Sequence, residues 1–374
     1  MGMPKPGLVG GPQGHLPFLV AGLKASKVEV VELTYGSLDG NPSLLGRISQ
    51  VLKTARAMRR ATRASAFDVV QLNTAFDVKA LLRDVVTVAL IRRRRRHKIL
   101  LKFHGSDAGL LATSNPVLRM LGQALMAMAD GMGTLSCEER DNFLRAGADA
   151  GKLHIVKNIL DPSLYHHDAG FRERLGVNRE TILLLFAGRM IPEKGLIDLV
   201  RACGILHSAE IDFHLVCLGD GPGRRPAEEE AARLNIGDRA TFLGQIPESD
   251  TRPFYANCSM LVFPTYHQEG FPMTVFQAVA AGLPVITTKI RAAADYLKEP
   301  DNCLWVEPKE PGIIADKIRS LMDDSVMRQH MAANNRALGA QFTRSIISAE
   351  FLGIYKVVVN RGEARLHCHA HILP

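Results

Sequence analysis

The sequence predicts an α/β protein with two parallel sheets, each doubly wound by helices. Short apolar runs alternate with helical stretches along the chain, and this alternation is typical of a parallel sheet with helices on both faces. At 374 residues the chain is long enough for two domains that each bury a core. A polar segment with tandem histidines, residues 161–174, separates two sets of apolar runs. We therefore expect two Rossmann-like domains that face each other across a cleft.

Each half of the chain contains five apolar runs that we expect to be strands. In the front half these are residues 28–34, 67–73, 99–104, 131–136 and 153–157. In the back half they are residues 181–187, 212–218, 240–243, 260–264 and 284–288. The expected parts are an N-terminal domain over 1–160, a linker over 161–174, a C-terminal domain over 175–345, and a C-terminal helix and tail over 346–374 that cross back to the N-terminal domain. In such sheets ligands bind beyond the carboxyl ends of the strands.

The loop after the expected strand 260–264 carries the most informative pattern. It holds one carboxylate, Glu269, and leads directly into an expected helix over residues 273–281. The N-terminus of a helix presents unpaired N–H groups and a partial positive charge, which suit a phosphate. Gly282 favours the left-handed conformation that ends a helix, and Pro284 follows it. The pattern predicts a site for a sugar attached to a diphosphate, with Glu269 beside a sugar hydroxyl or a developing positive charge.

Two cations follow the expected strand 181–187. Gly188 lets the backbone turn, and Arg189 and Lys194 bring positive charge to the same loop. Cleavage of a sugar–diphosphate bond builds negative charge on the departing phosphate, and fixed cations stabilise that charge in the transition state. Arg binds phosphate through its planar fork, whereas Lys acts as a point charge. Judged alone, the two cations are equally consistent with a surface Arg and Lys at the start of a helix.

These two motifs resemble those of the retaining, nucleotide-sugar-dependent glycosyltransferases of the GT-B fold, in particular glycosyltransferase family 4 (glycosyl transferases group 1). The resemblance covers most of the chain and is strongest over residues 183–306. That family's signature is a Glu, a Gly-Phe turn and a second Glu. Here the first is Glu269, the turn is Gly270 and Phe271, and Gln277 stands eight positions after Glu269 in place of the second Glu. The family's Gly-Arg…Lys-Gly motif matches residues 188–195.

The resemblance implies a role for each of these residues. Arg189 and Lys194 would neutralise the leaving diphosphate, the turn would bind it through backbone N–H groups, and Glu269 would orient the donor sugar. His104, at the end of a front-half strand, would meet the sugar from the facing domain, although an imidazole at a strand terminus is more often structural. The implied catalytic residues are Glu269, His104, Arg189 and Lys194, and the implied donor-binding residues are Gly10, Gly11, Gly188, Gly219, Asp220, Gly244, Gly270, Phe271, Pro272, Met273 and Gln277.

The substitution at Gln277 is the main departure from the family pattern. The resemblance implies that this residue lies against the nucleotide ribose, where relatives have a carboxylate. An amide offers one acceptor oxygen, whereas a carboxylate accepts from two hydroxyls through charge-assisted bonds. We therefore expect the replacement Gln277→Glu to lower the donor KM.

Two glycine-rich segments complete the implied donor site. Gly219 and Asp220 follow the expected strand 212–218, and with the segment that ends at Gly244 they match loops that lie along the nucleotide in the family. Taken alone, such a segment is more often a plain turn between a strand and a helix. Gly10 and Gly11 resemble the family's glycine loop that admits the sugar, where glycine allows close backbone approach.

The beginning of the chain departs from the expected fold. In this fold an apolar strand at the centre of the N-terminal sheet precedes the glycine loop, and residues 1–11 begin already inside that loop. A missing central strand would leave its neighbours with unpaired backbone groups. We therefore expect that the first strand of the N-terminal domain is missing, that upstream in-frame sequence encodes it, and that the front half is poorly folded as it stands.

The net charge of +8 is unevenly distributed. Residues 1–160 hold 23 Lys and Arg against 12 Asp and Glu, whereas the remainder holds 23 against 26. The basic front half predicts an anionic partner, either a membrane surface or a charged glycan lipid. Four cations of the expected helix 47–64 share one face, which is either solvated or docks on anionic lipid. They are Lys53, Arg56, Arg60 and Arg63. Nucleic acid is not expected, because the sequence holds no reading module and no interleaved aromatic residues.

Composition and cysteine spacing predict a cytoplasmic protein. No apolar run approaches the roughly 20 residues that span a bilayer, and no signal peptide opens the chain. The six cysteines lie far apart, several of them in apolar runs, as expected of reduced and buried thiols. Together with the basic front half, these features are consistent with a peripheral location at the inner face of the membrane.

We expect a retaining glycosyltransferase that moves a sugar from a nucleoside-diphosphate sugar to a hydroxyl of a glycan or lipid-linked glycan, in the synthesis of a bacterial surface polysaccharide or glycolipid. The resemblance implies that neither a cofactor nor a catalytic metal is needed, and the sequence holds no Asp-x-Asp metal motif. Two alternatives stay open. Gln277 and the unusual beginning suggest a nucleotide-sugar-binding protein that has lost catalysis, and nucleotide-sugar 2-epimerases share this fold.

Overall fold

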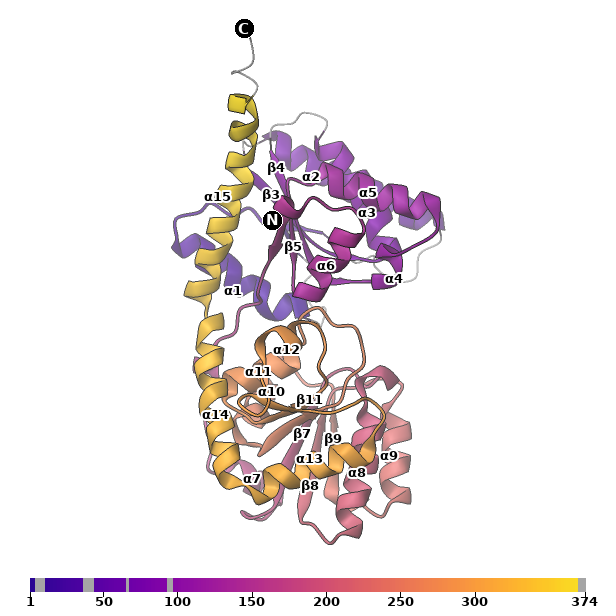
Figure 1. Cartoon of the computed structure of the whole chain (residues 1–374), viewed down its shortest axis with the longest axis vertical. Coiled ribbons are helices and arrows are strands. Elements are labelled where there is room, and N and C mark those ends of the chain that lie inside the picture. Colours follow the sequence, from indigo (N-terminus) through magenta and orange to yellow (C-terminus); the bar gives the residue numbers. More distant parts are fainter. Residues whose placement is uncertain (4–10, 36–43, 65–66, 93–96, 369–374) are drawn as a thin grey trace. The chain divides into compact units, whose positions relative to one another are not determined.

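The computed structural model describes residues 1–3, 11–35, 44–64, 67–92 and 97–368. The chain divides into two compact units (Figure 1). The first unit combines Met1–Ile159 with Arg344–Pro374, and the second unit is Leu160–Thr343. Each unit contains one parallel sheet of six strands. Among the helices of the described residues, none has the length and apolar character that crossing a bilayer requires.

The sheet of the first unit has the strand order β2-β1-β3-β4-β5-β6, and all of its pairs are parallel. The long central strands are buried, as their apolar sequences predict, and Ile99, Leu100, Leu101 and Phe103 of β4 are fully enclosed. The strands are β1 (Gly2–Met3), β2 (Leu33–Thr34), β3 (Val69–Phe76), β4 (Lys98–Ser106), β5 (Gly131–Thr134) and β6 (Leu153–Ile155).

The expectation that the first strand is missing is corrected by this sheet. Gly2 and Met3 form a short strand between β2 and β3, and the carbonyl of Gly2 accepts a hydrogen bond of 2.7 Å from Asn73 Nδ2. Glycine is needed at position 2, because an added Cβ would lie 2.9 Å from Cβ of Tyr35. The expected strand 28–34 forms only at Leu33–Thr34, since β1 offers only two residues for pairing.

Helices cover both faces of the first sheet. The strand order changes direction after β2, and right-handed crossovers therefore place α1 on one face and the later helices on the other. Figure 1 shows α1 and α15 on one side of this sheet and α2, α3 and α5 on the other. The helices are α1 (Gly11–Ala25), α2 (Leu44–Ala64), α3 (Val78–Arg92), α4 (Ala108–Leu111), α5 (Pro116–Met128), α6 (Cys137–Arg145) and α15 (Arg344–Cys368), with a short 3₁₀ helix, η1 (Ala150–Lys152).

Helix α15 belongs to the first unit although it ends the chain. Phe351 and Val358 are buried there, and an added Cβ at Gly131 of β5 would lie 2.6 Å from Val358. The hydroxyl of Tyr355 donates to Gln71 Oε1 of β3 at 2.6 Å. The last helix is thus built into the core beside the central strands.

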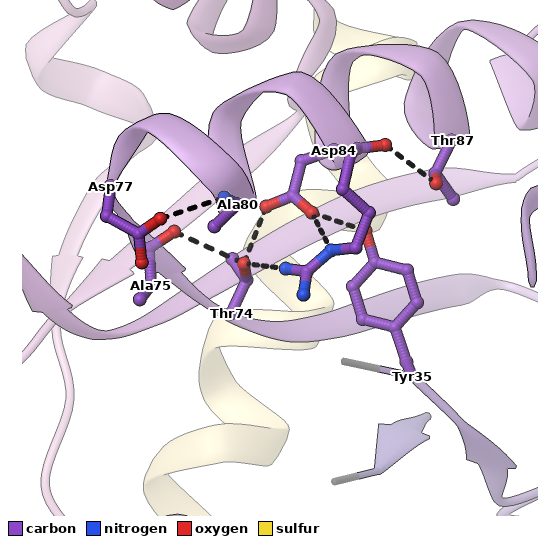
Figure 2. A network of polar contacts seen from close by, with 8 residues as sticks. Tyr35, Thr74, Ala75, Asp77, Ala80, Asp84 and Thr87 are labelled. Carbon is purple, nitrogen blue, oxygen red and sulfur yellow. Dashed lines mark hydrogen bonds and ion pairs between the residues drawn. The ribbon is translucent and has the colours of Figure 1, made fainter. Parts of the chain in front are cut away.

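A buried polar network joins the edge of this sheet to α3 (Figure 2). Asp84 of α3 is fully buried and accepts from the hydroxyls of Tyr35 and Thr74, each at 2.5 Å, and from Arg83 Nε at 2.7 Å. The Arg83 guanidinium also lies 4.5 Å from the centre of the Tyr35 ring. Burial raises the pKa of the Asp84 carboxyl, and Arg83 and the hydrogen bonds oppose that shift. The carboxylate therefore depends on all three partners.

We predict that Asp84→Ala destabilises the first unit by about 3–5 kcal/mol, because it leaves the partly buried Arg83 without its counter-charge. Hydrogen exchange of the β3 amides measures this loss within the first unit. The control is Asp141→Ala, which removes an exposed carboxylate paired with Arg140 and is expected to cost less than about 1 kcal/mol. Equal exchange rates in the two variants would contradict a stabilising role for the network.

The sheet of the second unit has the order β12-β11-β10-β7-β8-β9, again with parallel pairs throughout. Five of its strands match the expected runs, and β12 was not anticipated because its apolar run is short. The strands are β7 (Ile182–Ala187), β8 (Phe213–Leu218), β9 (Ala240–Gly244), β10 (Met260–Phe263), β11 (Val285–Thr287) and β12 (Cys303–Trp305).

The helices of the second unit include the segment expected as a linker. Residues 161–174 contain η2 and α7, and Phe171 is buried there with its ring 5.2 Å from that of Phe254, so this segment is counted with the second unit. The α-helices are α7 (Phe171–Arg174), α8 (Leu196–Ser208), α9 (Arg224–Arg233), α10 (Glu248–Asn257), α11 (Met273–Ala281), α12 (Arg291–Tyr296), α13 (Pro311–Asp323) and α14 (Ser325–Gly339). The 3₁₀ helices are η2 (Pro162–Leu164), η3 (Pro192–Lys194), η4 (Gly237–Arg239) and η5 (Ala340–Phe342).

Candidate functional site

Three loops of the second unit are joined through their backbones at the carboxyl edge of its sheet. After β7, the N–H of Gly188 donates to Leu218 O at 2.9 Å, and the N–H of Met190 donates to Asp220 O at 2.8 Å. After β8, the N–H of Gly219 donates to Gly244 O at 2.8 Å. The structure thus brings together four of the residues to which the resemblance assigns donor binding, namely Gly188, Gly219, Asp220 and Gly244.

Gly219 is the residue that permits this close approach. Its φ is +119°, and an added Cβ would lie 2.0 Å from the carbonyl oxygen of Gly188. The side chain of Asp220 is exposed, and it accepts from the N–H of Gly221 at 2.7 Å within its own turn. The side chain of Asp220 therefore stabilises its own turn. The backbone of this loop, rather than the Asp220 side chain, makes the contacts with the neighbouring loops.

Lys194 lies between the loops after β7 and β10. Its side chain is only 6% exposed and forms an ion pair with Glu269, and its Nζ lies 5.3 Å from the centre of the Phe263 ring. The backbone holds the two loops in place, since the carbonyl of Glu193 accepts from the N–H of Tyr266 at 2.8 Å. Two of the predicted catalytic residues are thus in direct contact, although they are far apart in the sequence.

The charge on Lys194 is set by its surroundings. Burial lowers the pKa of Lys194, and the nearby Arg189 lowers it further, to about 7. The Glu269 carboxylate acts in the opposite direction, because an opposite charge in contact favours the ammonium form. Arg189 itself is exposed at the start of the loop. The loop after β7 therefore presents one exposed cation, Arg189, and one buried cation, Lys194, whose charge depends on a negative neighbour.

Helix α11 begins where the sequence predicted. Pro272, its N-cap residue, offers no side-chain hydrogen bond, and Thr274 Oγ1 in the first turn donates to Ala187 O of β7 at 3.0 Å. The helix ends at Gly282 with φ +74°, as expected. The side chain of Phe271 is buried and stacks on Phe276 with ring centres 3.7 Å apart. The packing of Phe271 therefore fixes the turn at 270–273, and its buried ring is not available to a ligand.

Gln277 has a carboxylate partner that the sequence did not reveal. Its Nε2 donates to Oε1 of Glu248, in the first turn of α10, at 3.2 Å. Burial raises the pKa of Glu248, and Arg252 and the hydrogen bond from Gln277 oppose that shift. In the sequence Glu248 is an ordinary acidic residue in the first turn of a helix, where the helix dipole favours it. Its role as the partner of Gln277 becomes visible only when α10 is seen to lie beside α11. Gln277 keeps its amide oxygen and Glu248 keeps its carboxylate, so both residues can still accept hydrogen bonds from a ligand.

His104 lies in the first unit on β4. Its Nε2 is 3.4 Å from Asn73 Oδ1, and its ring centre is 5.4 Å from that of His15 on α1. The neighbouring Lys102 is fully buried, with Nζ 2.8 Å from His15 Nε2 and 3.0 Å from Asn158 Oδ1. Burial, followed by Lys102, lowers the pKa of His104 well below its ordinary value, so this imidazole is neutral near pH 7.

The predicted glycine loop is only partly described. Gly11 is the first residue of α1, and Gly10 lies outside the described residues. Over the part of the chain that the structure describes, no cluster of three or more His, Cys, Asp or Glu side chains is placed to hold a metal ion. The described cysteines are free thiols, and four of them are buried.

Two family models cover most of the chain. The model for glycosyl transferases group 1 matches residues 169–338, and that for the glycosyl transferase 4-like domain matches residues 10–158. Residues 169–338 belong to the glycosyl transferases group 1 family. The family expected from the two motifs is thereby confirmed, and the first model spans the residues that form the joined loops of the second unit.

Curated relatives agree at low identity. An uncharacterized glycosyltransferase of Methanocaldococcus jannaschii is 27% identical over 218 residues, which are 56% of this chain and 55% of the relative. The D-inositol 3-phosphate glycosyltransferase of Xylanimonas cellulosilytica is 28% identical over 264 residues, 67% of this chain and 62% of the relative. The chain thus spans somewhat more than half the length of these two relatives. Another uncharacterized glycosyltransferase of M. jannaschii is 25% identical over 361 residues, 90% of this chain and 91% of the relative.

Solved structures share the fold. Anabaena HepE in complex with UDP and glucose has a TM-score of 0.70 at 20% identity, over 88% of this chain and 87% of that one. The sucrose-phosphate synthase from Thermosynechococcus elongatus has a TM-score of 0.76 at 19% identity, over 93% of both chains. The expected class, two Rossmann-like α/β domains of the GT-B type, is therefore confirmed.

We predict that Gly195→Ala destabilises the second unit by about 1–3 kcal/mol, the usual cost of a residue held in a sparsely populated backbone region. Gly195 has φ +75°, and an added Cβ would lie 2.3 Å from Pro264 O, so the loop that carries Lys194 would have to move. The single tryptophan, Trp305 on β12, reports the unfolding of this unit in urea.

The matched control is Gly312→Ala in α13, where an added Cβ meets nothing within 4 Å. There the replacement is expected to leave stability unchanged or raise it by up to about 1 kcal/mol, because alanine restricts the unfolded chain. A Gly195→Ala midpoint equal to that of the control would show that the contact with Pro264 is not restrictive.

Proposed function

We propose that this protein transfers a sugar from a nucleoside-diphosphate sugar to a hydroxyl acceptor, with retention of anomeric configuration. The observation that carries the proposal is the buried ion pair of Lys194 with Glu269, beside the exposed Arg189 and next to the turn that opens α11. Two cations, a helix N-terminus and one carboxylate at the same sheet edge suit a diphosphate joined to a polyhydroxylated ring.

In this mechanism the residues of the second unit act on the leaving group. As the bond from the sugar to the diphosphate breaks, negative charge grows on the phosphate oxygens, and Arg189 and Lys194 stabilise it. The diphosphate also favours the charged form of Lys194, because it replaces Glu269 as the negative neighbour that offsets the effect of burial. Once Lys194 turns to the phosphate, Glu269 is released to hold a hydroxyl of the donor sugar.

UDP is the first nucleotide to test, because HepE binds UDP and glucose in its solved structure. Thermal stabilisation by UDP, ADP and GDP ranks the bases, since a ligand at a hundred times its dissociation constant adds about 2.7 kcal/mol. The decisive experiment is release of nucleoside diphosphate from the best donor, with and without an acceptor. Release that persists in EDTA supports the proposed independence from metal, and an epimerised donor sugar in place of release would favour a 2-epimerase.

For the acceptor we propose a glycan or lipid-linked glycan of a bacterial surface polysaccharide or glycolipid, reached from the inner face of the membrane. The support is the net charge of residues 1–160, which is +11 because they hold 23 Lys and Arg against 12 Asp and Glu. For the unit around His104 we propose the acceptor side, with the neutral imidazole of His104 meeting the donor sugar. The alternative of a binding protein without activity rested partly on the missing carboxylate at Gln277. Glu248 supplies a carboxylate beside Gln277, which weakens that argument.

We predict that Arg189→Ala and Lys194→Ala each lower kcat by roughly 10²–10³, the usual scale for losing one group that stabilises transition-state charge. The loss belongs to kcat because the charge grows as the bond breaks. Steady-state release of nucleoside diphosphate measures it. Arg225→Ala, which removes a cation that is 87% exposed on α9 of the same unit, is the control and keeps normal turnover. Near-normal kcat in both loop variants would remove the proposed role of these cations.

We predict that Glu248→Gln weakens donor binding roughly 10–100-fold, the scale of a lost hydrogen bond to a charged group. Gln277→Glu alone also weakens binding, because it places a second carboxylate against Glu248, contrary to what the sequence led us to expect. The double variant Gln277→Glu, Glu248→Gln exchanges the two groups and restores most of the affinity. Isothermal titration with UDP measures all three. Tighter binding by Gln277→Glu alone would show that Glu248 does not take part in donor binding beside Gln277.

A further inference from the structure

The three neighbouring helices α2, α3 and α5 together carry a larger net positive charge than the whole chain does. Their sequences contain ten Lys and Arg and one acidic residue, a net charge of +9, whereas the whole chain carries +8. The one acid is Asp84, which is fully buried and paired with Arg83. The outer face of this layer therefore presents positive charge with no exposed carboxylate from its own helices.

Six of these cations are exposed. Lys53, Arg56, Arg60 and Arg63 are exposed along α2, while Ala55 and Met58 form its buried side, as the spacing of the residues predicts. Lys79 on α3 and Arg119 on α5 are exposed as well. Within the described chain Lys53, Arg56, Arg60, Lys79 and Arg119 take part in no ion pair, so their charge is available to a partner. Packing of α2 on α3 and of α3 on α5 makes one continuous layer, seen in Figure 1.

Large apolar side chains are exposed on the same layer. Val78 and Leu82 in α3 are 42% and 50% exposed, and Val117 and Met120 in α5 are 57% and 61% exposed. Scattered apolar residues are normal on a protein surface, but a group of them rimmed by charge marks an interaction site. Here the four lie on two helices that pack together, with Lys79 and Arg119 next to them in sequence.

The topology places these apolar side chains at one edge of the sheet. Both α3 and α5 connect parallel strands, so each helix begins at the carboxyl edge of the sheet and ends at its amino edge. Val78 and Leu82 lie in the first two turns of α3, and Val117 and Met120 lie in the first two turns of α5. They therefore share the edge at which ligands of such sheets bind.

We propose that the outer face of α2, α3 and α5 docks this protein on a bilayer of anionic phospholipid. It is a surface apart from the donor site, and it does not depend on the proposed transfer reaction. The cations of α2, with Lys79 and Arg119, meet the lipid phosphates, and the four apolar side chains enter the interface below the headgroups. Basic residues combined with exposed aliphatic side chains are what such a surface binds. The docked face brings the ligand-binding edge of the first sheet toward the lipid.

Nucleic acid is the other polyanion that could contact the exposed cations of this face. Surfaces that bind single strands place aromatic rings among their cations so that bases can stack, and the sequences of α2, α3 and α5 contain no Phe, Tyr, Trp or His. The exposed residues among the cations are aliphatic instead, and they have no partner on a phosphate backbone. The composition of the face therefore favours lipid.

The test is sedimentation of the full chain with vesicles of phosphatidylcholine alone and of phosphatidylcholine mixed with phosphatidylglycerol. Binding is expected only to the mixed vesicles, and it weakens as salt is added. Arg56→Gln is expected to weaken binding about fivefold, the scale of one cation near an anionic leaflet. The triple variant Lys53→Gln, Arg56→Gln, Arg60→Gln loses binding roughly 100-fold by the same reasoning. Met120→Gln is expected to weaken binding without changing its dependence on salt.

Matched controls lie on the opposite face of the same unit. Lys356 and Val357 are exposed on α15, the latter by 47%, and Lys356→Gln and Val357→Gln are expected to leave vesicle binding unchanged. The proposal is overturned if the chain fails to bind mixed vesicles, if the triple variant binds as tightly as the parent, or if the α15 variants lose as much. Binding to duplex or single-stranded nucleic acid that is tighter than binding to vesicles, and insensitive to Met120→Gln, would overturn it in favour of a nucleic-acid surface.

Discussion

The burial of one ammonium group, that of Lys194, is the constraint on which the candidate site depends. A cation taken out of water is costly unless an opposite charge and fixed dipoles surround it. Glu269 supplies the opposite charge, but it stands on a different loop, so the loops after β7 and β10 must be held together. The carbonyl of Glu193 and the close approach of Gly195 to Pro264 do this. The glycines and the charged pair are therefore parts of one arrangement.

Much of this could be predicted from the sequence, because the determining signals are local. Apolar runs separated by helical stretches gave the strands of both sheets, and the second unit matched closely. The glycine that ends α11 and the cations at Arg189 and Lys194 were also visible, since they follow strands directly. In a parallel sheet, residues that follow different strands converge at one edge, so separate local motifs could be assigned to one site.

The rest required contacts between residues distant in the sequence. Glu248 and Gln277 are 29 residues apart in the sequence, and only the packing of α10 beside α11 brings them to 3.2 Å. Gly2 and Met3 carry no apolar run, and their strand exists because β2 and β3 offer backbone groups on either side. Likewise, Lys102 reads as a surface residue, but His15, Asn158 and the ring of Phe351 enclose it.

The return of α15 to the first unit has a consequence for how the chain is made. The first unit is assembled from two stretches of chain, and the second unit lies between them as an insertion. On the ribosome the N-terminal stretch emerges first, yet its core lacks Phe351 and Val358 until the second unit and α15 have been synthesised. The second unit is continuous and can close as soon as Thr343 has emerged. The half of the protein that is translated first is therefore the half that finishes folding last, and until then the face of its sheet that α15 covers is open to chaperones.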